Sequence, residues 1–199
     1  MSLLGAFIIV LLVLAAGTVG AFAYWQIAND LPDPGDLRNR ISQFETTRIL
    51  DREGNVLYEI LDPSAGRRTY VTLDDMSPYL VAATLATEDK EFYNHPGFDL
   101  IAIIRAFWQN LNSKETVSGA STITQQLTRT LFMSAEERAQ STYTRKMREA
   151  ILAAEITRRY TKDDILEIYL NENFYGNLAY GVEAAAQTYF GVSAKDLDL

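Results

Sequence analysis

The chain has 199 residues, no cysteine and a formal net charge of −8, and its length suits one domain with short appendages. The lack of cysteine excludes a disulfide framework, a thiol nucleophile and a thiolate metal site. The acidic balance argues against a nucleic-acid partner, because no basic stripe offsets it.

Residues 3–25 are apolar and carry no charge. About 20 such residues span the hydrocarbon core of a bilayer, and Tyr24 and Trp25 end the run with rings that favour the headgroup region. The alternative is a cleavable signal peptide, because Ala21-Phe22-Ala23 resembles a peptidase site. The run is longer than a signal sequence requires and has no basic start. We therefore predict a transmembrane anchor at residues 1–25.

The next two segments are predicted to contain little helix. Residues 26–45 include two prolines and a glycine among acidic residues, which indicates a linker. Residues 46–75 are predicted to form a small β element. Its main part is a β-hairpin of 46–50 and 56–60 around the turn residues Asp51 to Asn55, and a second extended piece is predicted at 68–73.

From Ser77 onward the pattern is helical. Ser77 and Pro78 fit an N-cap followed by proline in the first helical position, so a helix should run from there to Glu88. Further helices are predicted at 99–112, 121–133, 135–159, 162–171 and 179–189. Three pairs have capping-box spacing: Thr122 with Gln125, Ser134 with Glu137 and, more loosely, Thr161 with Asp164. The fold class is therefore predicted to be mainly α.

The helix predicted at 121–133 has a polar face beside its apolar one. Thr122, Gln125, Gln126 and Arg129 form this face, next to Ile123, Leu127 and Leu131. Two adjacent amides with a cation one turn away can hold a ligand rich in hydroxyls and phosphates. Helix patterning alone favours a solvated face instead.

Two glutamates could carry chemistry. Glu88 follows the apolar stretch 82–86, where burial would disfavour the charged form and allow the carboxylate to accept a proton near neutral pH. A charged helix end is the commoner explanation for such a residue. Glu149 shares a helix face with Arg145 and Lys146. As a surface ion pair this would contribute only tenths of a kcal/mol, whereas cations fixed in advance could stabilise a departing anion.

Five segments, in order, carry a resemblance to a known family. They are Glu88-Asp89-Lys90-Glu91-Phe92-Tyr93-Asn94-His95-Pro96-Gly97, Gly119 to Phe132, Arg145 to Ala150, Lys162 to Asn171, and Gly181 to Gly191. Together they resemble the motifs of the peptidoglycan glycosyltransferases of family 51, the polymerising domain of class A penicillin-binding proteins. One departure is Thr130, where asparagine would be expected.

The resemblance implies a lysozyme-like helical fold for residues 76–199, C-terminally incomplete, on the extracytoplasmic side of a bacterial cell membrane with a single-pass anchor. It implies polymerisation of lipid II onto a lipid-linked glycan chain by inverting displacement of polyprenyl diphosphate. Glu88 would be the general base, and Glu149 would act where the diphosphate leaves. Substrate-binding roles would fall to Asp89, Phe92, His95, Ser121, Thr122, Gln125, Gln126, Arg129, Arg145 and Lys146.

The resemblance leaves other questions open. A divalent cation, Mg²⁺ or Mn²⁺, could assist departure of the diphosphate, but no ligand cluster has clear spacing and we assign no metal ligand. Other cell-wall synthesis proteins could be partners. In inverting glycosidases the paired carboxyls stand about 6.5–9.5 Å apart, and we expect Glu88 and Glu149 at that separation or more. Apolar residues near Phe107, Trp108 and Leu111 could enter the membrane interface, although a buried core stripe explains them equally well.

Two other functions remain as alternatives. A lysozyme-like enzyme that cleaves glycans would also need a cleft glutamate, but the basic residues around Arg145 argue against it because a neutral leaving group needs no fixed cations. An inactive membrane-anchored scaffold is the second alternative.

Overall fold

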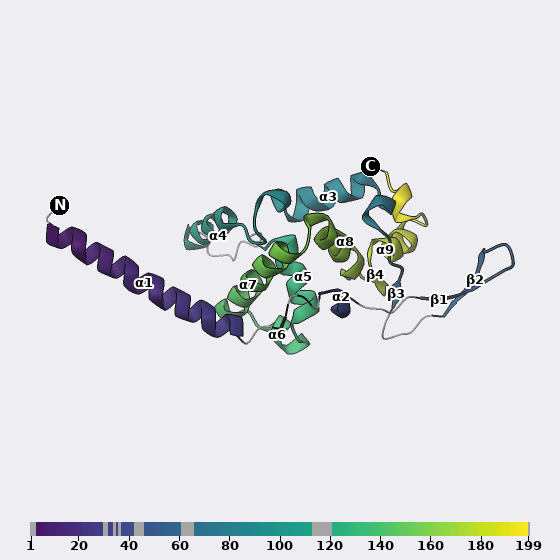
Figure 1. The fold of residues 1–199 in the computed structure, drawn as a ribbon. Helices are drawn as coiled ribbons and strands as arrows, with labels where there is room; N and C mark the ends of the chain where they lie inside the picture. Colours follow the sequence, from purple (N-terminus) through teal and green to yellow (C-terminus); the bar gives the residue numbers. More distant parts are fainter. Residues whose placement is uncertain are drawn as a thin grey trace.

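A computed structural model describes residues 3–29, 32–33, 35, 37–41, 46–60, 66–112 and 121–198. The described chain is mostly helical with little β-structure, which confirms the predicted mainly α class. In Figure 1 a helical body occupies the centre, helix α1 projects from one side of it, and the hairpin of β1 and β2 projects from the other.

Helix α1 spans Leu3–Asn29 and contacts helix α7 of the body. Within the described residues, no helix meets the combined length and hydropathy needed to cross a bilayer. The anchor predicted at residues 1–25 is therefore not shown and stays a prediction.

The predicted linker contains a residue of the core. Helix α2 (Leu37–Arg40) places the Leu37 side chain in the main apolar cluster, fully buried. The Arg40 guanidinium lies 4.7 Å from the centre of the Phe132 ring. The described part of residues 26–45 is thus attached to the body. The amino-acid composition of this segment indicated a break in regular structure, but it could not show that one leucine packs in the core.

The β-hairpin is confirmed. Strands β1 (Thr47–Leu50) and β2 (Val56–Ile60) pair antiparallel, with Ile49 opposite Tyr58. The turn between them is closed by the Asp51 carboxylate, which accepts hydrogen bonds from the backbone N–H groups of Glu53 and Asn55. Gly54 adopts φ +88° there.

The second extended piece does not extend this hairpin. Strand β3 (Arg67–Arg68) pairs in parallel with β4 (Ala179–Tyr180), more than 100 residues later along the chain. The helix predicted at 179–189 is consequently shorter, and α9 spans Val182–Tyr189 after Gly181 at φ +81°. Residues 73–75 form a 3-10 turn.

The remaining helices are α3 (Pro78–Glu88), α4 (Leu100–Asn112), α5 (Ile123–Phe132), α6 (Ala135–Ala139), α7 (Tyr143–Arg159) and α8 (Lys162–Glu172). All three predicted capping boxes are present. The single helix predicted at 135–159 is wrong, since Gln140 ends α6 and Thr142 caps α7 by accepting the Arg145 N–H. The sequence did not reveal this break because residues 140–142 include no proline or glycine to mark the end of a helix.

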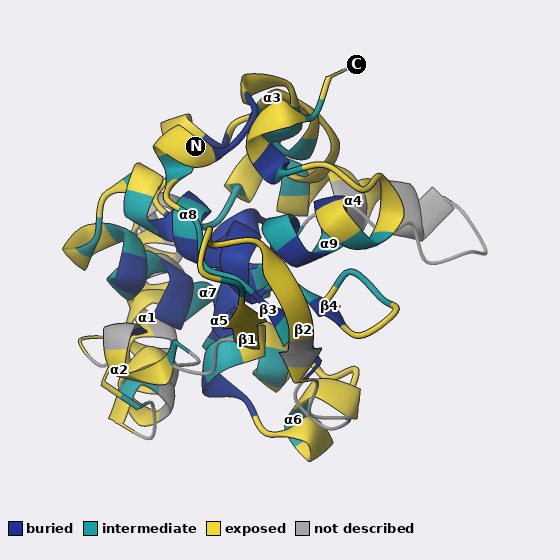
Figure 2. Ribbon diagram, turned by 90° about the vertical axis from the view of Figure 1, so that its right-hand side faces the viewer, coloured by how far each residue is buried: buried dark blue, intermediate teal, exposed yellow. Residues whose placement is uncertain are grey.

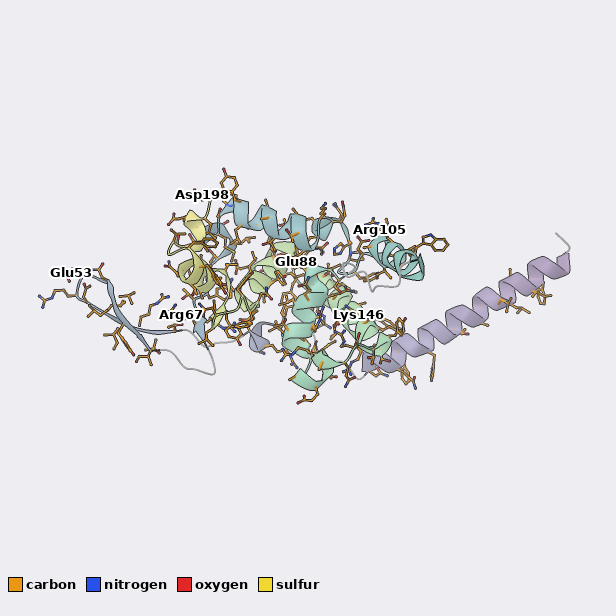
Figure 3. The ribbon with its side chains drawn as sticks, turned by 180° about the vertical axis from the view of Figure 1, so that it is seen from behind. Glu53, Arg67, Glu88, Arg105, Lys146 and Asp198 are labelled. Carbon is orange, nitrogen blue, oxygen red and sulfur yellow. The ribbon has the colours of Figure 1, made fainter. Side chains whose placement is uncertain are left out.

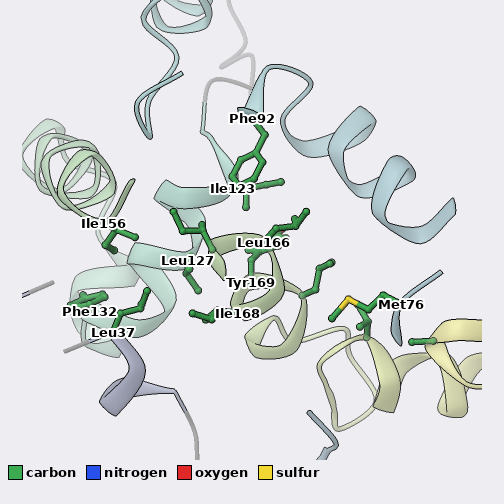
Figure 4. Packing of buried hydrophobic residues seen from close by; sticks show 14 of the residues in the cluster. Leu37, Met76, Phe92, Ile123, Leu127, Phe132, Ile156, Leu166, Ile168 and Tyr169 are labelled. Atoms are coloured by element: carbon green, nitrogen blue, oxygen red, sulfur yellow. The ribbon is translucent and has the colours of Figure 1, made fainter. Parts of the chain in front are cut away.

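The core lies between α5, α7 and α8. Figure 2 shows the buried residues gathered in these central helices, while β1 and β2 are exposed. Figure 4 shows Phe92 packed beside Ile123, with Leu127, Leu166 and Tyr169 below them. The cluster also includes Leu152, Ile156, Ile165, Ile168 and Leu170. Helix α5 therefore has a core on one side and is free to present polar groups on another.

Gly97 docks the loop before α4 onto α7. It adopts φ +100°, and a Cβ atom there would stand 2.3 Å from the Ala153 carbonyl oxygen. Its own carbonyl accepts a 2.6 Å hydrogen bond from Thr122, the N-cap of α5. Glycine is thus required for both the backbone angle and the close approach.

We expect Gly97→Ala to lower the free energy of unfolding by about 2–5 kcal/mol, from the left-handed backbone and overpacking against α7. Gly54→Ala is the matched control, because Gly54 has a similar φ but nothing within 4 Å of the added carbon. Denaturant titration of both variants checks this. Equal, small losses would contradict the proposed close approach.

Candidate functional site

A buried carboxylate surrounded by three cations forms the centre of the site. Glu149 on α7 has no exposed side-chain surface. Its oxygens lie 2.5 Å from Arg145 Nη1, 3.1 Å from Lys146 Nζ and 3.1 Å from Arg129 Nε. A buried carboxylate without partners would be strongly destabilising, so the three cations account for its presence in the interior.

Local structure places these groups together. Arg145 and Lys146 precede Glu149 by four and three residues on α7, and these spacings share a helix face. Arg129 comes from α5, which packs against α7. Lys146 also donates a 2.7 Å hydrogen bond to Ser121 Oγ, just before α5. The ion pair expected from sequence is therefore a partly buried cluster that joins two helices.

The cluster keeps cationic surface free for a ligand. Arg129 is 32% exposed and Lys146 is 44% exposed, while Glu149 is fully covered. Three positive charges face one negative charge, so the cluster as a whole is positive. It can bind an anion through N–H donors that are already fixed in position.

Glu88 lies at the end of α3 in a different environment. Its side chain is exposed, and its Oε2 accepts a 2.9 Å hydrogen bond from Gln126 Nε2 on α5. The expectation that Glu88 would be buried is wrong. The alanines of the stretch 82–86 are exposed, Leu85 packs against the core only as a partly buried residue, and α3 has no fully buried residue.

A cavity of about 390 Å³ lies beside Glu88. Glu88 and Ser121 both line it, and Ser121 is the hydroxyl that Lys146 contacts. Lining also comes from Lys90, from Asp99 before α4 and from Arg105 on α4. Figure 3 labels Glu88, Arg105 and Lys146 on their separate helices α3, α4 and α7. The separation of the Glu88 and Glu149 carboxyls stays a prediction.

Asp89 and His95 organise the loop that follows Glu88. The buried Asp89 carboxylate accepts the Ile123 N–H at 3.0 Å and lies 3.0 Å from His95 Nε2. His95 Nδ1 accepts the Gly97 N–H, which assigns the ring proton to Nε2, facing Asp89. The two residues thus join the loop to the start of α5, and any contact with a substrate stays a prediction.

Other expected site residues are also engaged within the protein. Thr122 and Gln125 are buried and bonded to each other in the α5 capping box. Phe92 is fully buried, with Lys162 Nζ 4.4 Å from its ring centre. Burial lowers the pKa of Lys162, and the charge of Asp89 offsets part of this effect. Of the expected polar face of α5, Gln126 and Arg129 are the members that keep some exposure.

Sequence reasoning missed three residues near the site. Lys90 and Arg105 line the cavity, and the Tyr169 hydroxyl donates a 3.1 Å hydrogen bond to Gln126 Oε1. Arg105 had a usable signal, because it is the one cation in the apolar stretch Leu100–Trp108. Tyr169 belongs to the resembling segment Lys162 to Asn171, but it lies among apolar core residues, and nothing in the sequence pointed to a role for its hydroxyl.

The described residues do not favour a metal site. No three His, Cys, Asp or Glu side chains converge among them. Glu149, the carboxylate nearest the expected diphosphate position, already contacts three cations. This donor set suits an anion, so we derive no step through a metal, and the Mg²⁺ or Mn²⁺ expectation stays untested.

Comparison with known proteins gives a consistent result. A family model described as "Transglycosylase" matches residues 53–199. Penicillin-binding protein 1A of Rickettsia conorii is 39% identical over 195 residues, 96% of this chain and 24% of that protein. Penicillin-binding protein 1A of Escherichia coli K12 is 42% identical over 189 residues, 94% of this chain and 21% of that protein. The chain thus spans about a quarter of the length of these relatives.

We expect Glu149→Gln to lower the free energy of unfolding by about 3 kcal/mol, the low end for breaking a buried ion pair, because Arg129 and Lys146 keep some hydration. Glu155→Gln on the same helix is the control. Glu155 pairs with Arg158 at a more exposed position, so its loss should cost less than about 1 kcal/mol. Similar denaturant midpoints for both variants would contradict the role assigned to Glu149.

Proposed function

Because the chain belongs to the transglycosylase family, we propose that it is a peptidoglycan glycosyltransferase that joins lipid II units into glycan strands. One observation supports this most directly. The exposed Glu88 carboxylate and Ser121 line one cavity, and the Ser121 hydroxyl accepts a hydrogen bond from Lys146, one of the three cations that surround Glu149. A base on a cavity, with an anion site joined to its wall through Ser121, suits displacement of a charged leaving group.

The reaction can be written on these residues. The 4-hydroxyl of the lipid II sugar attacks C1 of the lipid-linked chain, and Glu88 takes the hydroxyl proton. The bond between C1 and the diphosphate oxygen breaks as the new glycosidic bond forms, which inverts C1. Arg129, Arg145 and Lys146 stabilise the negative charge that develops on the departing polyprenyl diphosphate.

A glycan-cleaving activity fits this site less well. A glycosidase needs a carboxylic acid kept protonated by an apolar setting, whereas Glu88 is exposed. The leaving group of a glycosidase reaction is a neutral sugar, and three fixed cations would not stabilise its departure. The inactive scaffold is separated from both enzymes by a direct assay for polymer.

We infer further that the protein acts on the extracytoplasmic side of a bacterial cell membrane, anchored by residues 1–25. The uncharged sequence of residues 3–25 supports this, as do the exposed side chains Leu100, Ile101, Ile104 and Trp108 on α4. The side chains of Phe107 and Leu111 lie outside the described residues. Other cell-wall synthesis proteins stay as expected partners.

Glu88→Gln keeps the size and hydrogen bonding of the side chain but cannot accept a proton. We expect a fall of about 10²–10⁴-fold in the rate of polymer formation from lipid II, with binding of a lipid diphosphate analogue retained. Glu155→Gln should polymerise at the parent rate.

A Glu88→Gln variant that polymerises near the parent rate would exclude Glu88 as the base. Absence of polymer from the parent chain would favour the inactive scaffold.

If residues 1–25 form an uncleaved anchor, the protein extracted from membranes should begin at its original N-terminus and need detergent to remain in solution. N-terminal sequencing and sedimentation with and without detergent check this. A chain that begins at Tyr24 would instead establish a cleaved signal peptide.

A further inference from the structure

We propose that Tyr169 is a positioning residue for the reaction: its hydroxyl holds the Gln126 amide in the orientation that donates to Glu88. The inference rests on the proposed function, in which Glu88 is the general base. Tyr169 itself touches no reacting atom and acts only through Gln126.

Three helices contribute one group each to this chain of hydrogen bonds. Tyr169 on α8 donates to Gln126 Oε1 at 3.1 Å, and Gln126 on α5 donates through Nε2 to Glu88 Oε2 at 2.9 Å. Among the described contacts, these two are the ones made by the Gln126 amide. The chain therefore links the exposed end of α3 to the interior of the protein.

The chemistry of the groups fixes the direction of both bonds. An ionised carboxylate can only accept, so the amide must present its NH₂ group to Glu88. The amide oxygen then faces Tyr169, and an oxygen there requires a donor. The phenol is thus the donor, and without it the amide would lose the contact that holds this orientation.

Burial makes the tyrosine a firm attachment point. Tyr169 is 5% exposed and belongs to the main apolar cluster, whereas Gln126 is half-buried and Glu88 is exposed. An exposed carboxylate at a helix end has several accessible rotamers. A bond to an amide that is itself held from the core restricts those rotamers, and a general base requires such placement.

The phenol also keeps its proton. Burial raises the pKa of Tyr169, and the nearby Glu88 carboxylate raises it further. The hydroxyl therefore remains a donor at every pH at which Glu88 could act as a base.

The test is Tyr169→Phe, which removes the hydroxyl and keeps the ring in the core. We expect kcat for lipid II polymerisation to fall by about 3–10-fold, the loss of one hydrogen bond, while KM changes less than twofold. Tyr160→Phe is the matched control, since it also removes one hydroxyl hydrogen bond, to the Gly35 carbonyl at 3.1 Å, and should leave kcat unchanged.

A double-mutant comparison separates positioning from a general loss of stability. Gln126→Ala should lower kcat at least as much as Tyr169→Phe, and adding Tyr169→Phe to it should lower kcat no further. An equal effect of Tyr169→Phe in the parent and in Gln126→Ala would overturn the proposal.

Different experimental results would contradict the proposed base and the proposed positioning residue. If Glu88→Gln polymerises at the parent rate, the proposed base is wrong and the positioning role is lost with it. If Glu88→Gln is inactive while Tyr169→Phe keeps the parent kcat, the base stands and only the role of Tyr169 is overturned. Should Tyr169→Phe fold poorly, an unchanged kcat in Gln126→Ala would overturn the role of Tyr169 in the same way.

Discussion

The contact between Glu149 and its three cations is the constraint from which the rest of the site follows. A carboxylate with no exposed surface is stable only if its charge is matched, and the matching residues come from two helices. Satisfying Glu149 therefore fixes how α5 lies against α7. Gln126 and Arg129 of α5 then keep some exposure, whereas its apolar residues Ile123 and Leu127 are committed to the core.

The two glutamates show how environment separates the roles of identical side chains. Glu149 is buried and held by cations, so it is suited to ordering them and poorly placed to exchange a proton. Glu88 is exposed and held by a neutral amide, so its lone pairs remain available. Burial and the charge of Glu88 raise the pKa of Tyr175 to about 12, against a hydrogen bond with Asn173 that lowers it, so a second neutral phenol lies near Glu88. The carboxylate of the proposed base is thus held by a neutral amide, whereas that of Glu149 is held by three cations.

Much of this organisation could be predicted from local sequence. Capping pairs such as Thr122 with Gln125 act over three residues, so spacing alone identified them. The grouping of Arg145, Lys146 and Glu149 follows from helix geometry in the same way. Features that depend on distant partners could not be predicted. Leu37 reaches the core from a region of linker composition, β3 pairs with β4 across the chain, and Glu88 is exposed because α3 does not bury its alanines. The hydrogen bonds that link Tyr169, Gln126 and Glu88 require three helices to be in place, and no local sequence pattern predicts them.

The segment before α2 is bonded to the end of α7, and these bonds bear on how α1 is attached to the body. Arg159, at the end of α7, contacts the Asp33 carboxylate at 2.8 Å, and the next residue, Tyr160, donates to the Gly35 carbonyl. Together with the contact between α1 and α7, these bonds clamp the N-terminal helix to the helix that carries Glu149. The helical body is thus attached to α1 by direct contacts as well as by the chain that follows α1. A change in the tilt of α1 would therefore act directly on the C-terminal end of α7, which is the end remote from Glu149 and its cations.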